Sequence, residues 1–196
     1  MPWRHAIPRQ PKTIGRITHK LLQQSGVEPS VKKTIAVCGS DGEIPKDVEE
    51  LAELIGATLA ENDVVVVCGG RGGVMEAVCR GAKSKDGITV GLLPSGEKKE
   101  ANPYVDIALP TTLGFARNTL VAASADAIVT MHGSTGTLSE IALALNNKKH
   151  VFIIEDTGGV SARFGDILKG DKRGHLVHKT TKEKVVGELL NFLKTI

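Results

Sequence analysis

The sequence predicts a single-domain α/β protein in which helices cover both faces of a mostly parallel sheet. From Thr34 onward, short apolar runs rich in valine and isoleucine alternate with longer segments of helical periodicity. This alternation is typical of a three-layer, doubly wound sheet, whose ligands bind beyond the carboxyl ends of the strands. The chain has 196 residues, which is enough for one core and too few for two domains of ordinary size.

The predicted strands are short apolar runs. The valines at 64–67 form a continuously apolar run, as parallel strands buried on both faces usually do. In chain order, strands are expected at 34–38, 63–68, 88–93, 104–109, 127–131 and 150–155, with a weak strand near 176–177.

The predicted helices connect these strands. In the helix expected at 45–60, Pro45 suits the first turn. Apolar residues recur there at helical spacing and form an inward stripe: Val48, Leu51, Ala52, Ile55 and Leu59. Further helices are expected from 74 to about 83 and at 114–123, 138–145 and 182–193. The glycine-rich stretch 156–174 is expected to be a surface connection.

The charge of the chain is divided between a basic N-terminal extension, residues 1–33, and a mildly acidic body, residues 34–196. The extension carries seven Lys and Arg residues and one acid, for a net charge of +6. The body carries 18 bases and 21 acids, for a net charge of −3. An acidic body with few aromatic residues argues against nucleic-acid binding.

The extension contains a short amphipathic segment. Ile14, Ile17, Leu21 and Leu22 share one face of a predicted helix. A targeting signal is the alternative, but serine is scarce and no signal-peptide apolar region is present. We therefore expect this helix to dock on the domain or on a neighbouring subunit.

Apolar runs and cysteine usage predict a cytoplasmic protein without membrane contact. No apolar run approaches the roughly 20 residues that span a bilayer. The cysteines Cys38, Cys68 and Cys79 are odd in number and lack Cys-x-x-Cys spacing, so neither a disulfide framework nor a zinc site is expected. His175 and His178 have the spacing of a metal pair, but no third ligand is in view and no metal site is predicted.

Three small-residue turns follow predicted strands, at 39–42, 69–73 and 132–137. Parallel strands end at one edge of the sheet, so the turns should converge there. Backbone N–H groups at a helix start bind anions without a charged side chain. The alternative for each glycine, including Gly39 and Gly69, is a bend that needs unusual backbone angles. Candidate ligand contacts are Gly39, Ser40, Gly70, Arg71, Gly72, Gly73, Gly133, Ser134, Thr135, Gly136 and Thr137.

The common nucleotide motifs are absent from these turns. Gly70-Arg-Gly72 would need a third glycine at position 75 to form a dinucleotide fingerprint, but Met75 stands there. No Gly-x-x-x-x-Gly-Lys-Ser/Thr loop occurs either. The expected ligand is therefore a monophosphate or a similar group rather than NAD or ATP.

Glu140 and Arg117 are the charged candidates at this edge. Glu140 follows Gly136 by four residues, so its carboxylate could reach a ligand held by the third turn. The alternative is a capping box, Thr137-Leu-Ser-Glu140, in which the glutamate serves only the helix end. Arg117 is followed by Asn118 on the preceding helix; it is either a surface charge or a phosphate-binding fork.

Several of these motifs occur together in one known superfamily. The motifs are Cys38-Gly-Ser40, residues 68–78 and 101–105, Arg117-Asn118 and Gly133-Ser-Thr-Gly-Thr-Leu-Ser-Glu140. Over roughly residues 34–155 the chain resembles the Rossmann-like superfamily once labelled "possible lysine decarboxylase". That superfamily includes the LONELY GUY (LOG) phosphoribohydrolases and the molybdenum cofactor carrier protein. The closest resemblance is to the short branch that contains the carrier.

The resemblance implies roles for particular residues and an oligomeric state. It makes Arg117 and Glu140 candidate catalytic residues, Gly133, Gly136 and Thr137 candidate phosphate contacts, and the protein a homodimer or higher homo-oligomer. The LOG pattern has proline where this chain has His132, glycine at Ser134 and usually lysine at Asn118. These departures concern the LOG substrate more than the anion site.

Two functions are consistent with these residues and with the resemblance. In the first, the protein binds a phosphorylated nucleotide-like ligand and hydrolyses the N-glycosidic bond of a nucleoside 5′-monophosphate, with no cofactor required. In the second, the protein binds without turnover, either as a carrier of the molybdenum cofactor, a pterin phosphate, or as a nucleotide-binding protein. Both place the phosphate at the third turn.

Overall fold

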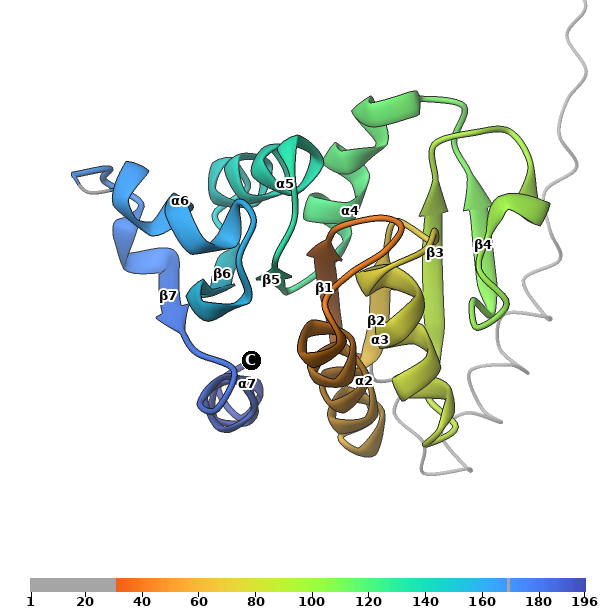
Figure 1. Ribbon diagram of the computed structural model, residues 1–196, viewed down its shortest axis with the longest axis horizontal. Helices are drawn as coiled ribbons and strands as arrows, with labels where there is room; N and C mark the ends of the chain where they lie inside the picture. The colour runs from red at the N-terminus through yellow and green to blue at the C-terminus, as the bar shows by residue number, and fades with distance from the viewer. Residues whose placement is uncertain (1–30, 169) are drawn as a thin grey trace, which may run out of the picture. The chain divides into compact units, whose positions relative to one another are not determined.

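The computed structural model describes residues 31–168 and 170–196, and within them a seven-stranded sheet in the order β4-β3-β2-β1-β5-β6-β7 (Figure 1). All six neighbouring strand pairs are parallel. The strands are β1 (Thr34–Gly39), β2 (Val65–Cys68), β3 (Thr89–Leu93), β4 (Ile107–Pro110), β5 (Ala127–Met131), β6 (His150–Ile154) and β7 (Val177–Thr180).

Helices alternate with these strands along the chain. They are α2 (Lys46–Glu61), α3 (Val74–Lys83), α4 (Asn118–Ser124), α5 (Thr135–Asn146), α6 (Ser161–Ile167) and α7 (Val185–Leu193). Single turns of 3-10 helix lie at Lys98–Glu100, Gly114–Arg117, Glu155–Thr157 and Gly174–Leu176.

The order of the strands reverses at β1. The chain first winds outward through β2 and β3 to β4, then returns to place β5 on the other side of β1. In open α/β sheets, such a reversal leaves a crevice at the carboxyl ends of the two central strands. The predicted doubly wound α/β fold is therefore confirmed, and β1 and β5 frame the crevice.

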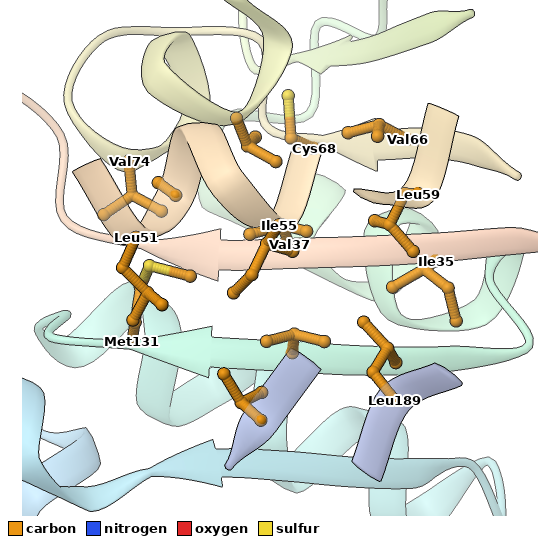
Figure 2. Packing of buried hydrophobic residues seen from close by; sticks show 14 of the residues in the cluster. Ile35, Val37, Leu51, Ile55, Leu59, Val66, Cys68, Val74, Met131 and Leu189 are labelled. Atoms are coloured by element: carbon orange, nitrogen blue, oxygen red, sulfur yellow. The ribbon is translucent and has the colours of Figure 1, made fainter. Parts of the chain in front are cut away.

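Successive side chains of a strand point to opposite faces of the sheet, so alternate residues of the central strands belong to two separate cores. Ile35 and Val37 of β1 pack with α2, α3 and α7, whereas Ala36 and Cys38 pack with α4, α5 and α6. Figure 2 shows the first core, in which Ile35 and Val37 meet Ile55 of α2 and Leu189 of α7. All of these core side chains except Cys38, which is 2% exposed, are fully buried.

The prediction for residues 156–174 was wrong. A surface connection was expected, but the stretch contains α6, and Phe164 of that helix is buried in the second core. The helix has only seven residues, too few for an apolar period to stand out, and Gly158 and Gly159 precede it with positive φ. The helix could therefore not be predicted from the sequence pattern, because it is short and follows two glycines.

Two other expectations concern the N-terminal extension and membrane contact. The amphipathic helix of the extension lies outside the described residues, although the first strand does begin at Thr34. Among the helices of the described residues, none combines the length and the apolar character that a membrane span requires.

His178 pairs with another histidine rather than with His175. Its Nε2 lies 2.8 Å from Nδ1 of His150, and its ring stacks on Phe152 with centroids 4.4 Å apart. Between residues 31 and 196, position 169 aside, no three His, Cys, Asp or Glu side chains are grouped to hold a metal ion. Burial and then the charge of His150 lower the pKa of His178 from 6.5, against a smaller opposing effect of Glu188.

The histidine pair predicts a loss of stability in mild acid. The pKa of His178 is lower in the folded protein than in the unfolded chain. As the pH falls below about 6.5, the unfolded chain therefore binds a proton before the folded protein does, and unfolding is favoured. His178→Phe keeps the ring on Phe152 and removes the titration. Urea unfolding between about pH 7.5 and 5 should show a smaller acid loss for this variant than for wild type.

The comparison reports on the histidine pair, because His178→Phe also removes the contact of His178 Nε2 with His150. His175→Gln removes an exposed histidine three residues away and should keep the wild-type profile. Parallel pH profiles for wild type and His178→Phe would show that the histidine pair does not couple to folding.

Candidate functional site

A pocket of about 180 Å³ lies at the carboxyl ends of β1 and β5, in the crevice that the strand order creates. Residues 37–39 and 69, segment 115–118 and the first turns of α5 form most of its wall. Nine of the fourteen predicted site residues line it: Gly39, Arg71, Arg117, Asn118, Ser134, Thr135, Gly136, Thr137 and Glu140. The other five do not line it: Ser40, Gly70, Gly72, Gly73 and Gly133.

The third turn ends in a helix start that opens into the pocket. After β5, His132 and Gly133 adopt positive φ of 51° and 90°, and α5 begins at Thr135. The first backbone bond of the helix runs from the N–H of Leu138 to the carbonyl of Ser134, at 3.0 Å. The N–H groups of residues 135–137 therefore lack an intrahelical acceptor, and the positive end of the helix lies beside them. This geometry suits a phosphate.

Side chains from two other segments hold the turn in place. The Ser40 hydroxyl accepts the N–H of Gly133 at 3.1 Å and lies 2.7 Å from Nδ1 of His132. The N–H of His132 donates to the hydroxyl of Thr157 at 2.7 Å. Proline could not replace His132 here, because its ring restricts φ to about −65°. The turn of this chain therefore differs in conformation from one that carries proline at this position.

Gly133 and Gly136 of the third turn differ in whether the surrounding atoms leave room for a side chain. A Cβ on Gly133 would lie 2.4 Å from Oγ1 and 2.6 Å from Cβ of Thr137, and its φ of 90° disfavours any side chain. A Cβ on Gly136 would meet nothing closer than the Asn118 Nδ2 atom at 3.8 Å. Packing therefore requires glycine at position 133, whereas at position 136 the space is left open toward the pocket.

Glu140 is not a helix cap, so the capping-box alternative was wrong. Ser134 occupies the N-cap position and Thr137 lies in the first helical turn, which places Glu140 too deep to reach the cap. Its buried carboxylate instead accepts a hydrogen bond from Nη1 of Arg117 at 3.4 Å. Burial raises the pKa of Glu140 to about 7, against the lowering effects of Arg117 and of the Cys38 thiol.

Arg117 is likewise buried, which excludes the surface-charge alternative. The residue is 8% exposed, and a Cβ on Gly69 would lie 2.4 Å from its Nη2. Neither Gly39 nor Gly69 has a positive φ, so the alternative of a bend that needs unusual backbone angles was wrong for both. Close approach explains them instead. The Nε of Arg117 is buried and has no hydrogen-bond partner among the residues that the structure describes.

Asn118 supports the helix start from the next position along the chain. Its Nδ2 donates to the Ser139 hydroxyl at 2.8 Å and to the Gly136 carbonyl at 3.3 Å. Because Asn118 follows Arg117 directly, one segment both anchors α5 and carries the guanidinium into the pocket.

The second turn is braced by a residue that sequence reasoning missed. Asp41 accepts the N–H of Gly72 at 3.0 Å and pairs with the Arg71 guanidinium, Oδ2 to Nε, at 3.1 Å. The N–H of Gly70 points to the Cys68 sulfur at 3.3 Å. Asp41 also lines the pocket, as does its partner Arg71. Its place in the first small-residue turn was the available signal.

A matched pair of alanine substitutions tests the two glycine roles. Gly133→Ala should lower the free energy of unfolding by at least about 1 kcal/mol, because of positive φ and the contact with Thr137. Gly136→Ala should leave stability unchanged or raise it by up to about 1 kcal/mol, as alanine does in helices. Urea denaturation of the two variants checks this, and equal losses would contradict the assignment.

Comparisons with known proteins agree with this architecture. A profile of the SLOG cluster4 family matches residues 32–186. A protein of Archaeoglobus fulgidus described as uncharacterized is 43% identical over 117 residues, which cover 60% of this chain and 76% of the relative.

Two solved structures cover nearly the whole domain. The molybdenum cofactor binding protein of the phototrophic bacterium Rippkaea orientalis is 31% identical, with a TM-score of 0.73 over 83% of this chain and 98% of its own. The molybdenum cofactor carrier protein of Chlamydomonas reinhardtii is 29% identical, with a TM-score of 0.73 over 84% and 99% of the two chains. The resemblance stated from the motifs is thus confirmed, and the chain belongs to the SLOG cluster4 family.

Proposed function

We propose that this protein binds a phosphorylated small molecule of the pterin or nucleotide type, with the phosphate at the start of α5 and against Arg117. The observation that carries the proposal is the buried Arg117 guanidinium. Within residues 31–196, position 169 aside, it makes one hydrogen bond, at 3.4 Å, and its Nε has no partner. A buried donor without an acceptor destabilises a protein by about 1–3 kcal/mol, and an anionic ligand would satisfy the neighbouring donors of the same fork.

The backbone N–H groups at the start of α5 and the Arg117 side chain both favour a negatively charged ligand group at this end of the pocket. The open N–H groups of residues 135–137 and the positive end of α5 attract an anion, as does Arg117. Glu140 opposes an anion only in part, because a pKa of about 7 leaves it partly protonated at neutral pH. Asp41 also lines the pocket, but its carboxylate is paired with the Arg71 guanidinium at 3.1 Å.

Binding without turnover is the function that we favour. The two structural relatives above are described as a binding protein and a carrier protein for the molybdenum cofactor. Carriage requires affinity and shielding, which the helix start, Arg117 and the pocket walls would supply. In this proposal the molybdenum cofactor, a pterin phosphate, is cargo, and Glu140 serves to hold Arg117.

Hydrolysis of a nucleoside monophosphate is the second candidate, and one observation favours it. A carboxylate with a pKa of about 7 is well matched to general-base catalysis at neutral pH. Glu140 would take a proton from the water that attacks the anomeric carbon while the C–N glycosidic bond breaks, and the departing base would take up a proton, which leaves ribose 5-phosphate and the free base. The oligomer implied by the family resemblance stays a prediction under either candidate.

Gly136→Val tests the phosphate site. The added methyl groups would enter the space in front of the helix N–H groups, where the protein atom nearest to an added Cβ lies 3.8 Å away. Losing one or two charge-assisted hydrogen bonds should weaken binding of AMP or a pterin monophosphate by roughly 10-fold to 100-fold or more. Isothermal titration calorimetry measures this directly.

The control is Gly187→Val, the same change in α7, where a Cβ meets no atom within 4 Å. It should keep wild-type affinity. An unaltered affinity of Gly136→Val for every phosphorylated probe would refute the phosphate site.

Glu140→Gln separates the two candidates. If the protein hydrolyses AMP, chromatography will detect released adenine, and the variant should lose roughly 10²-fold to 10⁴-fold of that rate while AMP binding is largely kept. The exposed Glu183→Gln is the matched control. Absence of adenine release from wild type that does bind AMP would rule out hydrolysis of this substrate and leave the binding proposal standing.

A further inference from the structure

One aromatic side chain lies in solvent at the rim of the pocket. Phe115 is 82% exposed, yet it lines the same pocket as Arg117. Of the four phenylalanines of the chain, Phe152 and Phe164 are 1% and 5% exposed and Phe192 is partly buried in the first core. A phenylalanine ring fully in water forgoes the free energy that burial of its surface would supply. Its position therefore calls for a partner.

The backbone holds Phe115 in place. Thr112 and Gly114 adopt positive φ of 59° and 54°, and the 3-10 turn Gly114–Arg117 follows. The N–H of Gly114 donates to the Pro94 carbonyl at 2.9 Å and that of Thr112 to the Ser95 carbonyl at 3.1 Å, which ties the segment to the end of β3. The ring is thus presented by a braced turn rather than by a free loop.

The same turn carries a charged and an aromatic residue, Arg117 and Phe115. Arg117, two residues after Phe115, lines the pocket, and its guanidinium donates a hydrogen bond to Glu140 of α5. Phe115 stays at the rim of that pocket. A ligand with phosphate at Arg117 and a planar ring system at its other end would meet charge and aromatic surface from one short segment.

We propose that Phe115 stacks on a planar heteroaromatic ring of the bound ligand and so selects ring-bearing phosphates over plain sugar phosphates. The inference rests on the proposed function, because it uses the same pocket. Aromatic rings stack on bases and pterins through their π-faces, without requiring particular hydrogen bonds. The stacked ring would also cover the phenylalanine surface that now contacts water.

The alternative occupant of this surface is another protein chain. Leu113, on the same turn, is 50% exposed but does not line the pocket. A protein contact would engage Leu113 together with Phe115, whereas ligand stacking requires Phe115 alone. Leu113→Ala is therefore the matched control.

The test compares ligands with and without a ring on the full-length chain. Isothermal titration calorimetry with AMP, a pterin monophosphate and ribose 5-phosphate gives the three affinities for wild type and variants. Phe115→Ala should weaken binding of at least one ring-bearing ligand by roughly 10-fold to 100-fold and leave ribose 5-phosphate unchanged. Phe115→Tyr should restore binding, and Leu113→Ala should behave as wild type.

A second measurement reports on the ring contact itself. Trp3 is the single tryptophan of the chain. In the double variant Trp3→Phe and Phe115→Trp, fluorescence should be quenched by AMP or the pterin monophosphate and not by ribose 5-phosphate.

Failure of this inference can be told from failure of the proposed function. Equal effects of Phe115→Ala on all three ligands, or no effect on any, would overturn the stacking role while the phosphate site stood. So would a change of sedimentation behaviour shared by Phe115→Ala and Leu113→Ala with ligand affinities intact. Wild type that bound none of the three ligands would overturn both proposals.

Discussion

Much of this site follows from placing one guanidinium in a narrow space at the end of the central strands. Arg117 is 8% exposed and lies so close to Gly69 that a side chain there would force the guanidinium to shift. A buried positive charge requires a counter-charge, and Glu140 of α5 supplies it from 3.4 Å. The same low-polarity surroundings raise the pKa of Glu140 to about 7, so the pair is only partly neutralised. The proposed phosphate site rests on this incomplete pairing.

The three small-residue turns, although similar in composition, differ in what their backbones do. The first turn supplies side chains: the Ser40 hydroxyl holds Gly133, and Asp41 holds Gly72. The second turn uses its N–H groups within the protein, on Asp41 and on the sulfur of Cys68. The third alone ends in a helix whose first N–H groups open into the pocket among the residues that line it. Glycine content by itself therefore does not mark an anion site.

The chain belongs to the SLOG cluster4 family and is similar in structure to proteins described as a binding protein and a carrier protein for the molybdenum cofactor, and its third turn departs from the LOG pattern. His132 has a φ of 51°, which proline cannot adopt, and its ring contacts Ser40. Ser134 is extended and serves as the N-cap residue without a side-chain cap. A glycine is not needed at position 134, because this backbone conformation is open to any residue. The substitutions relative to the LOG pattern are thus compatible with a helix start that binds phosphate.

The sequence by itself determined the alternation of strands and helices, the parallel sheet and the edge at which the turns gather. Continuous apolar runs such as 64–67 report burial on both faces, a property that does not depend on distant contacts. Only the tertiary structure decided that Glu140 pairs with Arg117, 23 residues away, and that Asp41 braces Gly72, 31 residues away. It also decided that α5 begins at Thr135 and that a short helix follows Gly159. Local periodicity records which side of an element is buried, whereas side-chain partners depend on how the loops of separate strands meet at the sheet edge.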